Sequence, residues 1–194
     1  MESIVFATSN PNKIREVDEL IGQIFHIIGL KEIGCEEDIP ETQPTIEGNA
    51  LQKAQYVLDN YQSDCFAEDT GLEVEALNGE PGVYSARYAG PQRNSQDNMN
   101  LLLQKLEGNV NRKARFKTVV ALVLEGEVHT FEGIVEGRIG FEPQGEGGFG
   151  YDPLFYPEGH DITFAEMDPE AKNAISHRGR AIRKLVDFLK ARNA

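Results

Sequence analysis

The chain has 194 residues, 40% of them hydrophobic, which is enough for one α/β domain or two closely joined lobes. Its formal net charge of −13 excludes a long nucleic-acid partner, which needs a basic surface, but allows a small phosphorylated ligand where cations gather locally. With no long apolar run and no signal or transit composition, we expect a soluble, cytoplasmic protein without a membrane partner.

The first predicted unit, residues 3–21, is a strand, a tight polar turn and a helix. An apolar run over 3–7, typical of a buried strand, is followed by hydroxyl and amide side chains suited to a turn or an N-cap. Pro11 fits the first position of the helix. Lys13 lies in the first turn, where the helix dipole disfavours a cation. It is either a solvated lysine or part of an anion site at this N-terminus.

A second strand is predicted over 24–30 and a second helix over 45–61. The connection between them, 31–44, is acidic, and one of its carboxylates folded over a site could help to hold a metal. Asn49 and Lys53 are four residues apart on the helix, so both can reach a common ligand.

Residues 65–72 predict a strand that runs into a turn at Thr70 and Gly71, with further strand over 72–77. Neighbouring strand residues point to opposite faces, so Glu68 and Asp69 are not expected to serve one site together. Asp69, at the predicted strand end, is the better site candidate, and the alternative is an aspartate that caps the turn.

The middle of the chain predicts a loop, a helix and a hairpin. The Gly- and Pro-rich segment 79–93 is a candidate lid or hinge. A helix is predicted over 94–106. Strands over 116–124 and 128–139 read as a β-hairpin that forms the second lobe of the sheet.

The loop 142–153 contains Gly-x-Gly-x-x-Gly, but Pro153 follows and no helix opens, which excludes a dinucleotide fingerprint. The loop presents Phe149 and Tyr151, with Asp152 beside them. These rings either stack on a base or fold into the core.

The last predicted helix begins near Ser176, a good N-cap. His177 and Arg178 fill its first turn, and Lys172 lies just upstream. Two helix N-termini that carry cations in an acidic protein suggest one anion site built from both.

Cysteine and histidine do not predict a metal site. Cys35 and Cys65 have no metal-binding spacing and indicate buried thiols rather than a disulfide. The four histidines are scattered along the chain.

Several short motifs occur in one order along nearly the whole chain. They are Thr8-x-Asn10-x-x-Lys13, Glu41 with Asn49-Ala50-x-x-Lys53-Ala54, Asp69-Thr70-Gly71-Leu72, Pro81-Gly82-Val83-Tyr84-Ser85-Ala86-Arg87, Gly147-Gly148-Phe149-Gly150-Tyr151-Asp152-Pro153 and Ser176-His177-Arg178-Gly179. As an ordered set they resemble the inosine/xanthosine triphosphate pyrophosphatase family.

The resemblance implies an α/β fold in one domain, residues 1–194, with a long mixed, twisted β-sheet, flanking helices and two lobes around a central active-site cleft. It implies Mg²⁺-dependent hydrolysis of the non-canonical purine nucleotides ITP, dITP and XTP to the monophosphate and pyrophosphate, which cleanses the nucleotide pool. It also implies a homodimer.

The resemblance assigns Asp69 as proton acceptor and metal ligand, Glu41 as a second metal ligand and Lys13 as a catalytic residue. One departure is Gly48, where many relatives carry Glu, at the outer contacts of the metal. The implied substrate-binding residues are Thr8, Ser9, Asn10, Pro11, Asn12, Lys13, Lys53, Thr70, Phe149, Gly150, Tyr151, Asp152, Lys172, His177 and Arg178.

Arg178 also suggests how the base is chosen. Its guanidinium is donor-only and would lie among the free N–H groups of a helix start, so it would accept a six-oxo purine and reject adenine. Two other functions stay open: a pyrophosphatase for pyrimidine or modified nucleotides, and a nucleotide-binding regulatory module without catalysis.

Overall fold

The computed structural model describes residues 2–192. The strands are β1 (Glu2–Phe6), β2 (Phe25–Ile28), β3 (Cys65–Val74), β4 (Pro81–Gly82), β5 (Lys113–Leu124), β6 (Glu127–Ile139) and β7 (Phe155–Pro157). The helices are α1 (Pro11–Ile21), α2 (Ile46–Tyr61), α3 (Ser95–Lys105), α4 (Pro169–Ile175) and α5 (His177–Arg192). Short 3-10 helices occur at η1 (Leu30–Ile33), η2 (Glu75–Leu77), η3 (Ser85–Arg87) and η4 (Asp152–Leu154).

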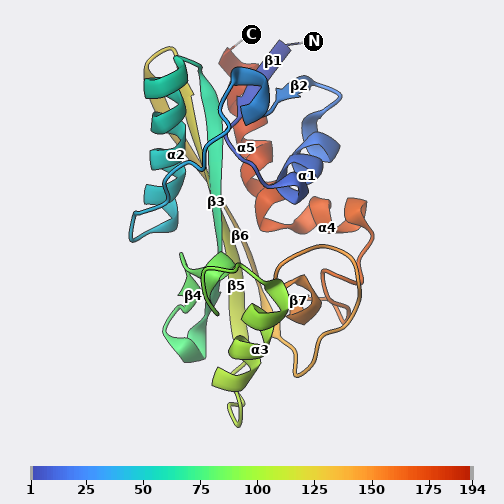
Figure 1. Cartoon of the computed structure of the whole chain (residues 1–194). Helices are drawn as coiled ribbons and strands as arrows, with labels where there is room; N and C mark the ends of the chain where they lie inside the picture. Colours follow the sequence, from blue (N-terminus) through green and yellow to red (C-terminus); the bar gives the residue numbers. More distant parts are fainter. Residues whose placement is uncertain (1, 193–194) are drawn as a thin grey trace. The chain divides into compact units, whose positions relative to one another are not determined.

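The strands form one seven-stranded sheet in the order β2-β1-β3-β5-β6-β7, with β4 paired to β3 (Figure 1). β1 runs parallel to β2 and β3, whereas β7 runs antiparallel to β6. The predicted mixed sheet with flanking helices is therefore confirmed. Among residues 2–192, no helix combines the length and the apolarity needed to cross a membrane.

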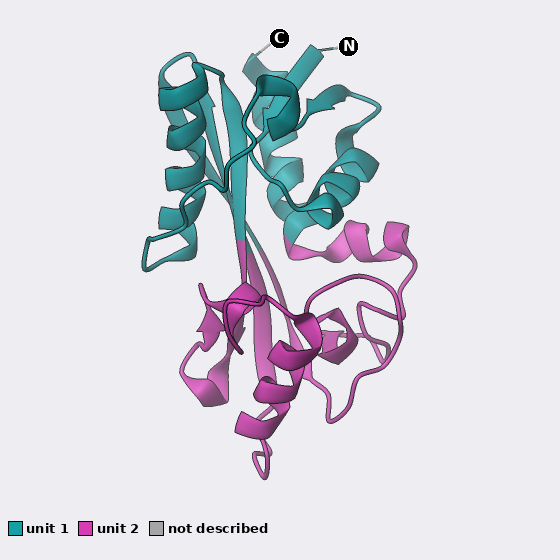
Figure 2. Cartoon of the chain, viewed as in Figure 1, with its two compact units in different colours: residues 1–69, 118–133, 178–194 teal, residues 70–117, 134–177 magenta. Residues whose placement is uncertain are grey.

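The chain divides into two compact units (Figure 2). Unit 1 comprises residues 1–69, 118–133 and 178–194, and unit 2 comprises 70–117 and 134–177. Strands β3, β5 and β6 each contribute residues to both units.

The core of unit 1 lies between the sheet and the pair α1 and α5. Val17 of α1 and Ile182 of α5 are fully buried against sheet residues such as Phe66. On the other side of these strands lies α2, and the Cys65 thiol donates to the Ala54 carbonyl of that helix at 3.5 Å (Figure 1). Both cysteines are buried and free, as predicted, and burial raises the pKa of Cys65 to about 12.

The core of unit 2 lies on one face of its sheet residues. Leu72 and Val74 of β3 and Phe116 of β5 point into a cluster that α3 covers with Leu102. The residues that alternate with them, such as Glu73, point to the other face, as the two-residue period of a strand requires.

Most predicted elements are present, but β3 contradicts the predicted turn. The strand runs unbroken through residues 70 and 71. Thr70 is β-branched and suits a strand, and Gly71 is buried where a missing side chain permits close packing. Asp69 therefore lies inside a strand and caps no turn. Beyond Val74 the chain forms η2, not the further strand that was expected.

Candidate functional site

The start of α1 is built as its sequence predicts. The Asn10 side chain accepts hydrogen bonds from the N–H groups of Asn12, at 2.9 Å, and Lys13, at 3.4 Å. Pro11 occupies the first helical turn, and the Asn10 N–H donates to Thr8 Oγ1 at 3.2 Å. The turn is therefore fixed by its own side chains, which leaves the Lys13 side chain to extend from an ordered helix start.

The cations at the two helix starts meet at one carboxylate of the chain itself, that of Glu68. Lys13 Nζ lies 2.8 Å from Glu68 Oε1. Arg178 donates from Nε to Glu68 Oε2 at 2.9 Å and from Nη2 to Oε1 at 3.0 Å, and it also pairs through Nη1 with Glu16. The anion site predicted from the two N-termini thus contains an internal anion.

These four side chains, Lys13, Glu16, Glu68 and Arg178, form what we call the buried quartet. Burial raises the pKa of Glu68, but the nearby charges of Arg178 and Lys13 outweigh it and hold that pKa well below its usual range. Burial likewise opposes the charge of Arg178, while Glu68 and Glu16 raise its pKa. Glu68 and Arg178 are therefore charged at neutral pH, and the formal charges of the quartet, two positive and two negative, cancel.

The quartet changes the surroundings that were predicted for the Arg178 side chain. Its side chain is 1% exposed, and both edges of its guanidinium already face carboxylates. The prediction that this helix start offers donors and no acceptor is wrong. Glu16 was not identified from the sequence, and Glu68 was set aside in favour of Asp69; their partners are distant in sequence, so no local pattern signals them.

A second ionic group surrounds Lys53 of α2. Lys53 Nζ lies 2.8 Å from Glu41 Oε1 and 3.7 Å from Asp69 Oδ1. Lys53 and Asp69 are both buried, and Asp69 Oδ2 has no hydrogen-bond partner within residues 2–192. Burial raises the pKa of Asp69, an effect that Lys53 and Lys13 only partly oppose. Asp69 is thus a buried carboxylate with one unpartnered oxygen.

The same group fits a Mg²⁺ ion. Among residues 2–192, no cluster of three or more His, Cys, Asp or Glu side chains is arranged to hold a metal. Glu41 and Asp69 offer only oxygen ligands, and Mg²⁺ commonly takes one or two carboxylates and keeps several waters. The unpartnered Oδ2 of Asp69 is an oxygen of the kind that such an ion requires.

In unit 2, a buried ion pair supports the loop that carries Phe149. Asp152 Oδ2 accepts from Lys172 Nζ at 2.7 Å and from the Phe149 N–H at 3.0 Å. Lys172 Nζ lies 5.1 Å from the centre of the Phe149 ring. At Gly148 φ is +65°, and a Cβ atom there would lie 2.2 Å from Asp152 Oδ2, so this approach requires glycine.

The other two rings predicted to meet the substrate lie in the core of unit 2. Tyr151 is 5% exposed, and its hydroxyl donates to the Ser85 carbonyl at 2.7 Å. His177 is 3% exposed and stacks on Phe116 with ring centres 4.6 Å apart. Phe149 is half-buried, so it is the loop aromatic that a base could reach.

The predicted site residues thus fall into two groups, each described within its own unit. Unit 1 holds Thr8, Ser9, Asn10, Pro11, Asn12, Lys13, Glu41, Lys53, Asp69 and Arg178, and unit 2 holds Thr70, Phe149, Gly150, Tyr151, Asp152, Lys172 and His177.

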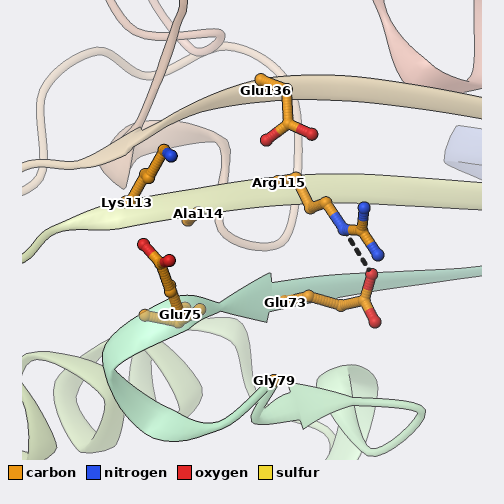
Figure 3. Close-up of a pocket in the computed structure, with 8 residues that line it drawn as sticks. Glu73, Glu75, Gly79, Lys113, Ala114, Arg115 and Glu136 are labelled. Carbon is orange, nitrogen blue, oxygen red and sulfur yellow. Dashed lines mark hydrogen bonds and ion pairs between the residues drawn. The ribbon is translucent and has the colours of Figure 1, made fainter.

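A surface pocket of about 270 Å³ in unit 2 involves neither group (Figure 3). Its lining includes Glu73 of β3, Arg115 of β5 and Glu136 of β6. Arg115 pairs with Glu73 at 2.9 Å, but both side chains are partly exposed, and such pairs contribute little. The predicted chemistry does not lie in this pocket.

Comparisons with known proteins agree with the motif set. The Ham1 family matches residues 4–188. The dITP/XTP pyrophosphatase of Flavobacterium johnsoniae is 57% identical over 97% of this chain and 98% of its own. That of Porphyromonas gingivalis is 54% identical over 97% of this chain and 98% of its own.

Solved structures show the same architecture. The Staphylococcus aureus Ham1 protein has a TM-score of 0.89 at 40% identity, and it covers 98% of this chain and 100% of its own. A HAM1 protein from Coxiella burnetii has a TM-score of 0.90 at 38% identity, with the same shares covered.

Proposed function

This chain belongs to the Ham1 family, and we propose that it hydrolyses non-canonical purine nucleoside triphosphates to the monophosphate and pyrophosphate. The names of its curated relatives, which are dITP/XTP pyrophosphatases, support dITP, XTP and the related ITP as substrates. The cellular role that follows is removal of these nucleotides from the pool. A homodimer is proposed on the resemblance of the motifs alone.

The observation that carries this proposal is the state of Asp69. A general base needs a carboxylate oxygen that no protein group already occupies and a pKa raised toward the working pH. In Asp69 burial raises the pKa, and the buried Oδ2 oxygen has no hydrogen-bond partner within residues 2–192. Proton acceptance by a placed carboxylate contributes roughly 10²–10⁴-fold to the rate.

The cations of unit 1 support binding of the phosphates. The start of α1 offers the partly exposed Lys13, and Lys53 lies beside Asp69. These charges would stabilise the negative charge that develops on the leaving pyrophosphate. We also propose Mg²⁺ as cofactor, held by Glu41 and Asp69, where it would supply charge neutralisation and polarise a phosphoryl oxygen.

For the purine base we propose stacking on Phe149. Its ring is half-buried, and the Asp152–Lys172 pair holds the backbone beside it. Tyr151 and His177 would act by supporting this loop from the core.

The proposal is tested by a substrate panel with Mg²⁺ in which both products are measured. We expect dITP, XTP and ITP to give monophosphate and pyrophosphate in equal amounts, well ahead of dATP. Faster turnover of dTTP or UTP would assign the enzyme to pyrimidine nucleotides. Tight nucleotide binding without pyrophosphate release would instead identify a regulatory module.

A further inference from the structure

The segment Glu41–Gln43, which we call the Glu41 arm, has no regular structure of its own, yet consecutive residues are bonded to α2. The Thr42 N–H donates to Gln52 Oε1 at 2.8 Å, and Gln52 Nε2 donates to Thr42 Oγ1 at 2.8 Å. The Gln43 N–H donates to Asn49 Oδ1 at 2.9 Å. Three hydrogen bonds that involve the side chains of Asn49 and Gln52 thus hold the two residues that follow Glu41.

Asn49 is placed for this contact and shows no other. It is 1% exposed, and its Nδ2 atom has no hydrogen-bond partner within residues 2–192. Leaving a buried donor unpaired costs free energy, so a helix optimised for stability alone would not carry asparagine here. The hydrogen bond that its side-chain oxygen accepts from the arm is the contact that explains an asparagine at this position.

Gly48 lets the arm approach this closely. A Cβ atom at position 48 would lie 2.8 Å from Gln43 Cβ and 2.9 Å from the Thr45 hydroxyl that caps α2. Any side chain at Gly48 would therefore displace the arm or the cap.

The Glu41 arm fixes the position of Glu41. Its carboxylate pairs with Lys53 Nζ at 2.8 Å, and the long lysine side chain imposes little geometry on its partner. A metal ligand must be held to within about 0.5 Å, and the residues behind metal ligands commonly change metal affinity by roughly 10–100-fold when they are removed. The amide bonds at Thr42 and Gln43 supply restraint that Lys53 does not.

We infer that Asn49 and Gln52 are positioning residues that hold Glu41 at the metal site by fastening the Glu41 arm to α2. This inference rests on the proposed function in one respect, which is that Glu41 binds Mg²⁺.

The test compares Gln52→Ala with Gln55→Ala in the full chain. Gln55 lies one turn further along α2 and bonds to Asp59 at 2.8 Å, so its replacement reproduces the loss of a glutamine but leaves the arm intact. Two quantities are measured: amide hydrogen exchange in metal-free protein by NMR, and Mn²⁺ affinity by electron paramagnetic resonance.

We expect Gln52→Ala to speed exchange of the Thr42 N–H and to weaken Mn²⁺ binding about 10-fold, while Gln55→Ala changes neither. Gln52→Glu should restore protection of the Thr42 N–H, because its carboxylate can accept from both Thr42 donors. Asn49→Ala should likewise expose the Gln43 N–H. If Asn49→Ala does not fold, the comparison of Gln52→Ala with Gln55→Ala still tests the inference, because Gln52 is only half-buried.

Glu41→Gln separates failure of this inference from failure of the proposed function. Weaker Mn²⁺ binding in Glu41→Gln together with unchanged binding in Gln52→Ala would overturn the positioning role alone. Unchanged Mn²⁺ binding in Glu41→Gln would remove Glu41 from the metal site, and the inference would fall with it.

Discussion

Asp69 is a buried carboxylate with one unpartnered oxygen, so replacing it should affect activity and stability differently. Burial raises its pKa, so its contribution to stability is present at low pH and is lost as pH rises through that pKa. Asp69→Asn removes the buried charge and should therefore keep or raise the melting temperature at pH 7. Hydrolysis of dITP should fall by roughly 10²–10⁴-fold. Calorimetry and pyrophosphate release measure the two effects, and near-normal turnover would remove Asp69 from catalysis.

The same shift predicts how Asp69 titrates in the metal-free protein. Its carboxyl ¹³C signal should titrate at a higher pH than that of an ordinary aspartate, because burial disfavours the charged form.

Arg178 is expected to act on stability first. Arg178→Ala leaves Glu16 and Glu68 as buried charges without their main partner, and breaking such a group costs about 3–5 kcal/mol. Urea unfolding at pH 7 should show this loss, whereas Arg180→Ala, exposed on the same helix, should change stability by no more than about 0.5 kcal/mol.

The choice between dITP and dATP distinguishes a scaffold role of Arg178 from a role in base selection. If Arg178 acts only on the scaffold, Arg178→Ala should reduce the hydrolysis of dITP and dATP in equal proportion. If Arg178→Ala keeps full stability and loses dITP turnover selectively, the guanidinium recognises the purine base. Arg178→Lys, which keeps the charge, gives the same comparison if the alanine variant does not fold.

At the scale of elements, the connection before α2 is fastened at a second point, Glu37. Its carboxylate accepts from Tyr61 at 2.5 Å and from Tyr56 at 2.8 Å, and these bonds lower the pKa of Glu37 to about 2, with Tyr61 the larger cause. A lowered pKa stabilises the fold above the ordinary glutamate range, and this contribution is lost as pH falls toward about 2.

Tyr61→Phe should therefore raise the pKa of Glu37 toward its usual range, and Tyr56→Phe should raise it less. Carboxyl ¹³C NMR titration measures both. The stability difference between Tyr61→Phe and wild type should be present at pH 7 and should shrink as the solution is acidified toward pH 2. A Glu37 titration that neither variant moves would contradict the assigned cause.

For the whole molecule, periodicity and capping chemistry predicted what is local. The strand before Thr8, the helix from Pro11 and the helix that ends at Tyr61 are all present, because each depends on neighbours in sequence. The turn expected at residues 70–71 failed because burial within a sheet outweighed the local preference of a Thr-Gly pair. The short helix α4 was not anticipated from the sequence.

The site was predictable by residue type and not by partner. The sequence predicted Lys13, Arg178 and Asp69 as candidate site residues, but the carboxylate of Glu68 that pairs with Arg178 is 110 residues away and Glu16 is 162 residues away. Pairings at such separations are set by packing of the sheet and helices, so no spacing rule encodes them.

The neutrality of the buried quartet has a consequence for how fast a nucleotide arrives. Its two cations are cancelled by Glu16 and Glu68, so they do not offset the net charge of −13 that an approaching triphosphate meets at long range. The encounter should therefore be slowed by repulsion rather than steered by attraction. Raising ionic strength from about 0.01 to 0.15 M shortens the screening length from about 30 to about 8 Å, and kcat/KM for dITP at constant Mg²⁺ should rise over this range. A fall of kcat/KM over the same range would show that an attractive field guides the substrate after all.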